Sequence, residues 1–168
     1  MSENDWIRGI VEQYEERLCG YAYSLAGNLD MARDAVQETF LRLCREPRGK
    51  LAGREAAWLF RVCRTRVFDI KRKERRTSPL SEIREASLKA EGASPAESLM
   101  AEEQESLLAR MLAALPERQR EVIRLKFQQD LSYREIAQVL DISEGNVGYI
   151  IHMGVKALRE KLHSMGGS

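Results

Sequence analysis

The sequence has few of the residues that build disulfide frameworks, metal sites or membrane spans. Its 168 residues include only three cysteines and two histidines. Cys19, Cys44 and Cys63 lie far apart without a C-x-x-C pair, and each occupies an apolar helical position, which favours buried free thiols. No stretch of about 18 apolar residues is present. We therefore expect no disulfide, no bound metal or cofactor and no membrane insertion.

A catalytic centre is equally hard to build from these residues. His152 and His163 are the only histidines, no paired carboxylates lie in an apolar setting, and there is no glycine-rich phosphate loop. The sequence therefore predicts a protein that is not an enzyme. The polar N-terminal residues MSENDW also lack the basic and then apolar layout of a signal peptide, so we expect a cytoplasmic protein.

Apolar residues recur at spacings of three and four through most of the first 76 positions, and no strand pattern interrupts them. The pattern predicts a helix over about 5–25, a second helix that follows Gly27 and Asn28 and ends at about Arg45, and a third over 54–76. The last two are separated by a basic, glycine-containing loop, PRGKLAG, which can approach a ligand closely. Three helices with facing apolar stripes predict a small bundle.

The helix expected over 54–76 is strongly basic. It contains nine Lys or Arg against three Asp or Glu, on a chain whose net charge is +1. One face carries the apolar stripe Leu59, Val62, Cys63, Val67 and Ile70, and the opposite face carries Arg61, Arg64, Thr65, Phe68 and Arg72. Trp58, Phe60 and Phe68 interleave with the arginines. This mixture suits phosphate contact and stacking on unpaired bases, although a solvated helix face would show a similar charge run.

The charge distribution predicts two domains joined by a linker. Residues 1–76 carry 16 basic and 12 acidic side chains, 77–106 carry 2 and 7, and 107–168 carry 9 and 7. Helical periodicity fails after Arg76 and resumes at Ser94, where Ser94 and Glu97 form an expected capping box that starts a helix ending near Ala114. We therefore assign 1–76 and 94–168 to domains, and 77–93 to an acidic flexible linker.

The second domain ends in a pattern typical of a helix-turn-helix. A helix is expected from Pro116, with Val122 and Ile123 inward and Leu125 or Phe127 joining them. Ser132 and Glu135 form a capping box before the short helix SYREIAQVL. The turn DIS follows, and Ser143 caps a last helix that is expected to end near Leu162. Ala137 supplies the small side chain that crossing helices need, and Asp141 tolerates a positive φ in the turn.

Three segments together resemble bacterial sigma factors of the extracytoplasmic-function (ECF) group of the sigma-70 family. These segments are DAVQETFLRL, AWLFRVCRTRVFDIKRKERR and LPERQREVIRLKFQQDLSYREIAQVLDIS. The resemblance covers about Tyr14 to Leu162. It implies an all-α protein whose first domain is sigma region 2 and whose second is region 4. It also implies that the chain binds the two largest subunits of core RNA polymerase, directs promoter-specific initiation at −10 and −35 elements, and is held by an anti-sigma factor.

The resemblance implies roles for residues at matching positions. The residues that it implies for docking on the polymerase are Asp34, Gln37, Glu38 and Leu41. They project away from the apolar stripe of the second helix, which contains Phe40. Contact with the −10 element, including capture of a flipped base, falls to Arg48, Lys50, Arg61, Arg64, Thr65, Phe68, Arg72, Lys73, Arg75 and Arg76. Contact with the −35 element falls to Ser132, Arg134, Ser143, Glu144, Asn146, Tyr149, His152, Lys156 and Arg159.

The last helix departs from the family pattern. Gly148, Ile150, Met153 and Val155 occupy positions that are basic in the family, and Thr65 stands where asparagine is frequent. A helical projection puts Val147, Ile151, Leu158 and Leu162 inward, with Met153 and Tyr149 among the outward residues. Fewer cations predict a weaker grip on DNA by this domain. Gly145, Gly148 and Gly154 each cost roughly 1 kcal/mol in a helix interior, so we expect a marginal recognition helix.

Two other readings remain open. A helix-turn-helix regulator of the response-regulator type would have a similar C-terminal sequence pattern. Such a protein also needs a strand-containing domain before the helix-turn-helix, and residues 1–76 show no strand pattern. A helical adaptor without nucleic-acid binding would explain the bundle and predicts no salt-sensitive DNA affinity.

Overall fold

The computed structural model describes residues 2–77 and 102–166, and all of its regular elements are helices. The chain divides into two compact units, Met1–Ala93 and Ser94–Ser168. The described helices agree with the predicted all-α class. The expected linker 77–93 and the capping box at Ser94 and Glu97 lie outside the described residues, apart from Thr77.

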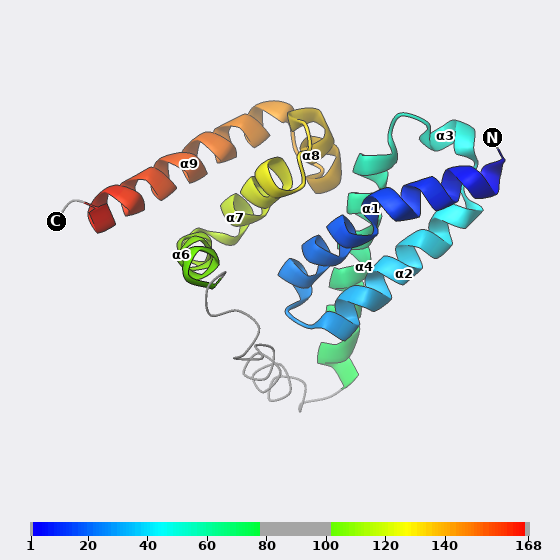
Figure 1. The fold of residues 1–168 in the computed structure, drawn as a ribbon, viewed down its shortest axis with the longest axis horizontal. Helices are drawn as coiled ribbons and strands as arrows, with labels where there is room; N and C mark the ends of the chain where they lie inside the picture. The colour runs from blue at the N-terminus through cyan, green and yellow to red at the C-terminus, as the bar shows by residue number, and fades with distance from the viewer. Residues whose placement is uncertain (1, 78–101, 167–168) are drawn as a thin grey trace. The chain divides into compact units, whose positions relative to one another are not determined.

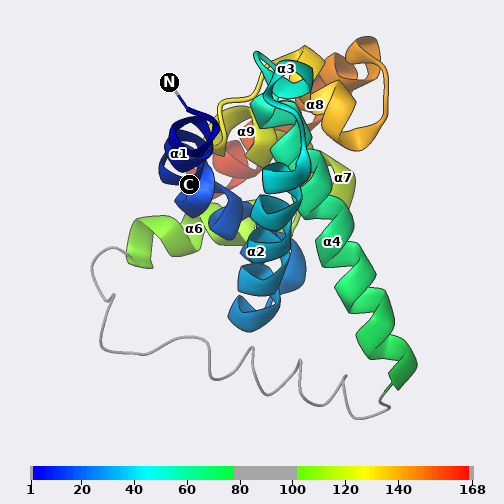
Figure 2. The same cartoon turned by 90° about the vertical axis from the view of Figure 1, so that its right-hand side faces the viewer.

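The first unit packs three long helices against one another, α1 (Glu3–Ala26), α2 (Leu29–Arg45) and α4 (Glu55–Thr77), as Figure 1 and Figure 2 show. The α1–α2 turn follows from its sequence. Gly27 adopts φ 71° and its N–H donates to the Tyr23 carbonyl, which ends α1. The side-chain oxygen of Asn28 then accepts from the Met31 N–H at 3.1 Å and begins α2.

The core of this unit is apolar and includes an aromatic cluster. Phe60 is fully buried between Tyr14 and Tyr21, with ring centroids 6.5 and 5.3 Å away in edge-to-face geometry. Phe60 interleaves with the arginines in the sequence, but its burial leaves it unavailable for stacking on bases. Its position at the margin of the apolar stripe lets the ring turn into the gap between α1 and α4.

In the first unit, two features differ from the sequence prediction. Helix α1 begins two residues earlier than expected, because Ser2 and Asp5 form a capping box. The expected loop PRGKLAG contains one helical turn, α3 (Arg48–Leu51), whose Leu51 side chain is 5% exposed and joins the core. The loop is therefore held in place by its own apolar residue.

The second unit comprises α6 (Glu102–Ala113), α7 (Glu117–Ile123), the π-helical turn η1 (Arg124–Gln128), α8 (Tyr133–Leu140) and α9 (Glu144–Gly166). Val122, Ile123 and Leu125 are buried as predicted, whereas Phe127 is 62% exposed. In η1 the hydrogen-bond register widens, with the Gln129 N–H donating to the Arg124 carbonyl. The last helix ends at Gly166, four residues beyond the prediction, and Leu162 is 53% exposed, so its inward assignment is wrong.

Candidate polymerase- and DNA-binding surfaces

One long face of α2 is exposed. Asp34, Gln37 and Leu41 are all exposed, while Ala35, Val36, Thr39 and Leu43 on the other side are buried. Leu41 is 54% exposed, a large apolar side chain among polar ones. The structure therefore brings three of the four predicted docking residues onto one accessible surface, with an apolar centre.

Glu38, the fourth predicted docking residue, is half-buried and pairs with Arg66 of α4. The same Arg66 lies 3.7 Å from Asp69, which is in turn 4.0 Å from Arg72. Glu38 thus connects α2 to the basic helix within the folded unit. Sequence periodicity placed it on the outer face but gave no sign of the pairing, because Arg66 lies 28 residues away.

An apolar groove adjoins the exposed face of α2. It has a volume of about 450 Å³ and lies between α1 and α2. Its walls are Val11, Glu15 and Cys19 from α1 and Arg33, Val36, Gln37, Phe40, Leu41 and Cys44 from α2. Because Gln37 and Leu41 belong to both, the groove and the docking face are continuous. Sequence reasoning missed the α1 residues, although Val11, Glu15 and Cys19 follow the i, i+4, i+8 spacing of a helix face.

The three thiols differ more than the sequence suggested. Cys63 is fully buried, and burial raises its pKa to about 12. Cys19 is half-buried with a raised pKa, again through burial first, followed by the nearby Glu15 carboxylate. Cys44 is exposed at the groove, so the prediction that all three are buried is wrong for Cys44.

The basic helix α4 separates its two faces as predicted. Leu59, Cys63 and Val67 are buried, whereas six of the predicted −10 residues are exposed, namely Arg61, Thr65, Arg72, Lys73, Arg75 and Arg76. Its C-terminal turns project past the ends of α1 and α2, as Figure 2 shows. The cations at this end therefore stand clear of the bundle and are open to a polyphosphate.

The remaining −10 candidates have more defined surroundings. Arg64 and Phe68 are half-buried, and the Arg64 guanidinium lies 4.8 Å from the centroid of the Phe68 ring. The Thr65 hydroxyl donates to the Arg61 carbonyl at 3.0 Å, which leaves its oxygen as an acceptor. Arg48 and Lys50 are exposed on α3. Helix α4 thus presents cations, an aromatic ring and a hydroxyl, and α3 adds two further cations.

Helices α8 and α9 form the predicted helix-turn-helix. Ser132 and Glu135 make the capping box, Asp141 ends α8 with φ 56°, and Ala137 is buried at the crossing. The Ser143 hydroxyl oxygen accepts from the Asn146 N–H at 3.1 Å and begins α9. Ser132 and Ser143 therefore serve as helix caps in the folded unit, although both remain exposed.

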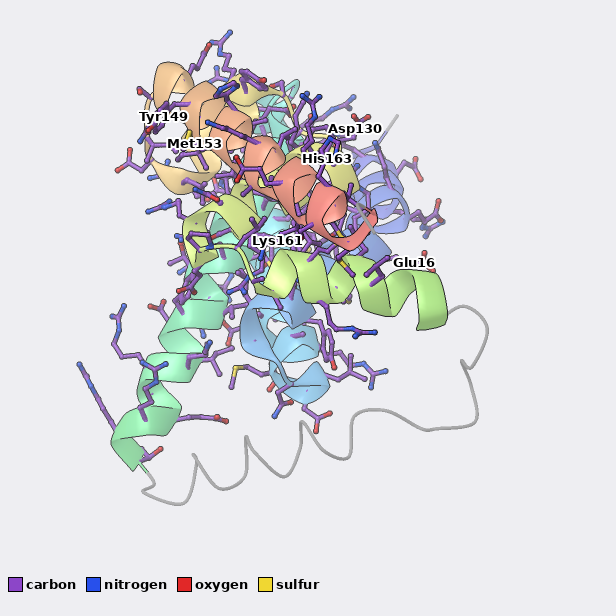
Figure 3. All side chains as sticks on the ribbon, turned by 90° about the vertical axis from the view of Figure 1, so that its left-hand side faces the viewer. Glu16, Asp130, Tyr149, Met153, Lys161 and His163 are labelled. Carbon is purple, nitrogen blue, oxygen red and sulfur yellow. The ribbon has the colours of Figure 1, made fainter. Side chains whose placement is uncertain are left out.

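The other predicted −35 residues line the exposed side of this motif. Arg134, Glu144, Asn146, His152, Lys156 and Arg159 are exposed, and Tyr149 is 63% exposed. Figure 3 shows Tyr149 and Met153 on the same side of α9. Met153 is half-buried, so it lies less outward than the projection indicated. Among the predicted contacts on α9, the only Lys or Arg side chains are Lys156 and Arg159.

Gly154 has a packing role that the sequence did not reveal. It is buried where α9 crosses α7, and a Cβ at this position would lie 2.5 Å from Ile123 Cδ1. Ile123 forms a cluster there with Leu112 and Leu115, against which Ala157 and Leu158 pack. Gly145, by contrast, has open space where a side chain would be. Close packing against α7 therefore requires a glycine at position 154, but no packing contact requires one at position 145.

Each of the two units matches the model of a known protein family. The sigma-70 region 2 family model matches residues 10–77, and the sigma-70 region 4 model matches residues 105–158. The chain is 33% identical to the ECF RNA polymerase sigma factor SigL of Mycobacterium tuberculosis over 162 residues, which cover 95% of this chain and 90% of SigL. The chain belongs to the ECF sigma factors.

Other relatives agree with this assignment. This sigma factor is 28% identical to ECF RNA polymerase sigma factor SigW of Bacillus subtilis, over 97% of its own length and 92% of SigW. Its fold resembles CnrH, solved in complex with the cytosolic domain of CnrY, with a TM-score of 0.59, 20% identity and coverage of 97% and 91% of the two chains. It also resembles RpoE, solved with the anti-sigma factor NepR from Bartonella quintana, with a TM-score of 0.58, 21% identity and coverage of 92% and 95%.

The expectations of no membrane span and no metal site can be compared with the structure only for the residues it describes. None of the helices in 2–77 and 102–166 is long and apolar enough to cross a membrane. The same residues hold no group of three or more potential metal-binding side chains. Sigma factors are regulators of transcription, and a non-enzymatic role is consistent with this family.

Proposed function

We propose that this sigma factor docks on core RNA polymerase through α2 and its adjoining groove, opens the −10 element with α3 and α4, and contacts the −35 element with α8 and α9. The separation of surfaces within the first unit carries the proposal. Asp34, Gln37 and Leu41 are exposed on α2, while the exposed cations of α4 include those on its C-terminal turns, which project past the ends of α1 and α2 (Figure 2). One bundle can then hold polymerase and DNA at the same time.

The docking face suits a basic helical partner with an apolar side chain. Asp34 supplies negative charge, Leu41 supplies an exposed apolar contact, and the groove beside it accepts a side chain of the partner. Because Glu38 is already paired with Arg66, we assign it to the connection between α2 and α4 rather than to direct contact.

The DNA-binding surfaces are unequal in charge. Polymerase holds the two units on the same promoter, so each contact benefits from the effective concentration that the other provides. A weak −35 contact through α9 is therefore sufficient within the holoenzyme. Binding of the isolated chain to bare DNA should be poor.

The partners follow from the same proposal. We place the chain in the cytoplasm, where the polymerase and the chromosome are. CnrH was solved with the cytosolic domain of CnrY, and RpoE was solved with the anti-sigma factor NepR from Bartonella quintana. We infer that an anti-sigma factor also binds this chain. The response-regulator alternative is not favoured, because the N-terminal unit is itself a sigma region 2.

Reconstituted transcription tests this function. Sigma-free core polymerase is incubated with the chain and with fragments of genomic DNA from the source organism, and the RNA 5′ ends are mapped. The proposal predicts discrete start sites whose upstream DNA shares −10 and −35 sequences. RNA no more abundant or specific than that made by core alone would contradict it, provided that a known sigma factor activates the same core.

The exposed thiol of Cys44 provides a direct test of the groove. A maleimide should label Cys44 first, because Cys63 is buried with a pKa of about 12 and Cys19 is half-buried. Core polymerase should slow the labelling of Cys44, as measured by peptide mass spectrometry. Equal labelling rates in the free chain and in an isolated complex would remove the groove from the docking surface.

A further inference from the structure

The α3 turn holds its backbone firmly but leaves Arg48 exposed. Leu51 anchors the turn in the core, and the Ala52 N–H donates to the Arg48 carbonyl at 3.0 Å. Gly53 then adopts φ 83°, which allows the chain to turn into α4. In the described residues no carboxylate pairs with the Arg48 guanidinium. A long side chain on a fixed backbone therefore needs another contact to restrict its direction.

The first turn of α1 supplies such a contact. The Arg48 guanidinium carbon lies 6.0 Å from the ring centroid of Trp6, which is half-buried. Figure 1 shows the N-terminal turn of α1 beside α3. The Ser2–Asp5 capping box fixes the turn that carries Trp6, with the Trp6 N–H donating to the Ser2 carbonyl at 3.1 Å. Both partners of the contact thus start from well-defined backbones.

This contact has the properties of an orienting surface. An aromatic face attracts a guanidinium without using its N–H donors, whereas a carboxylate would occupy them. The donors of Arg48 stay available for a base edge or a phosphate. The ring therefore reduces the directions open to Arg48 while preserving its ability to bind.

We propose that Trp6 is a positioning residue for Arg48, and that it directs the Arg48 guanidinium toward the base captured from the −10 element. This proposal rests on the assignment of α3 to −10 capture made above. It gives the N-terminal turn of α1 a part in promoter recognition, in addition to its place in the bundle.

A double-mutant cycle tests the proposal. The affinity of the reconstituted holoenzyme is measured for single-stranded DNA that carries the −10 sequence found by mapping start sites. Trp6→Ala should weaken binding by about two- to fivefold, the effect expected of an exposed cation–π contact. Trp6→Phe should restore most of this affinity, and Asn4→Ala, an exposed change in the same helical turn, should have no effect.

The decisive variant combines Trp6→Ala with Arg48→Ala. If Trp6 acts through Arg48, the added change costs nothing once Arg48 is gone. An equal loss in both backgrounds would overturn the proposal, because Trp6 would then act independently of Arg48. Thermal unfolding and co-elution with core establish that each variant is folded, and a loss caused by unfolding would appear in both backgrounds.

The outcomes also separate this proposal from the function on which it rests. If Arg48→Ala leaves −10 affinity unchanged while the holoenzyme still initiates at discrete sites, Arg48 is not a capture residue and Trp6 has no such role. If the chain does not activate core polymerase at all, the proposed function itself fails.

Discussion

Helices α4 and α9 are both 23 residues long and both carry predicted DNA contacts, but they are built differently. Helix α4 contains eight Lys or Arg and no glycine, whereas α9 contains three Lys or Arg and four glycines. Helix α4 buries one apolar stripe and projects a free cationic end. Helix α9 packs closely against α7 at Gly154, where a side chain would clash with Ile123. The difference in charge predicts that α4 contributes more of the electrostatic attraction to DNA than α9 does.

Removing cations from the two helices should reveal this inequality most strongly. The variant Arg72→Gln, Arg75→Gln, Arg76→Gln removes three exposed charges from α4. Each lost phosphate contact lowers the slope of log affinity against log salt by about 1, so the slope should fall by about 3. The slope is obtained by titrating holoenzyme with promoter DNA at several salt concentrations.

The corresponding variant on α9, Lys156→Gln, Arg159→Gln, removes two charges and should reduce the slope by about 2 at most. A larger reduction from the α9 variant than from the α4 variant would reverse the comparison. Both variants should co-elute with core polymerase as the parent does, because neither changes a residue of α2.

The glycines of α9 can be separated by stability measurements. Gly154→Val places a branched side chain against Ile123 and should lower the free energy of unfolding of the second unit by about 1–3 kcal/mol. Gly145→Ala enters open space and should raise it by up to about 1 kcal/mol. Amide hydrogen exchange in α7 and α9 reports both changes. A stabilising Gly154→Val would show that α9 does not need close approach to α7.

The Glu38–Arg66 pair gives the smallest expected effect. Both side chains are partly exposed, so Glu38→Gln should lower the stability of the first unit by about 0–1 kcal/mol. It should also weaken polymerase binding less than Asp34→Asn does, because Asp34 is unobstructed at the docking face. Denaturant unfolding and a polymerase titration measure the two quantities. A greater binding loss for Glu38→Gln would return Glu38 to the docking surface.

Local sequence signals predicted those parts of the fold that depend on neighbours in the chain. Ser132 with Glu135, Asp141 with its positive φ, and the α4 stripe all follow from rules that span a few residues. The helix-turn-helix could therefore be located from spacing alone. The predicted assignments of individual side chains to DNA or polymerase remain proposals.

Features that depend on tertiary contacts were not predictable in this way. Phe60 and Phe68 both interleave with arginines, but only Phe60 meets Tyr14 and Tyr21 in the core. The buried position of Gly154 depends on Ile123, 31 residues earlier in the chain. Helical periodicity gives the side of a helix, and it does not state which neighbour lies there.

Co-elution with sigma-free core RNA polymerase on a sizing column shows whether the chain docks on the polymerase. We expect that the wild-type chain co-elutes with core, that Asp34→Arg combined with Leu41→Arg abolishes the complex, and that Arg72→Gln does not. A folded wild-type chain that elutes alone, while a known sigma factor binds the same core, would show that the chain does not dock on the polymerase.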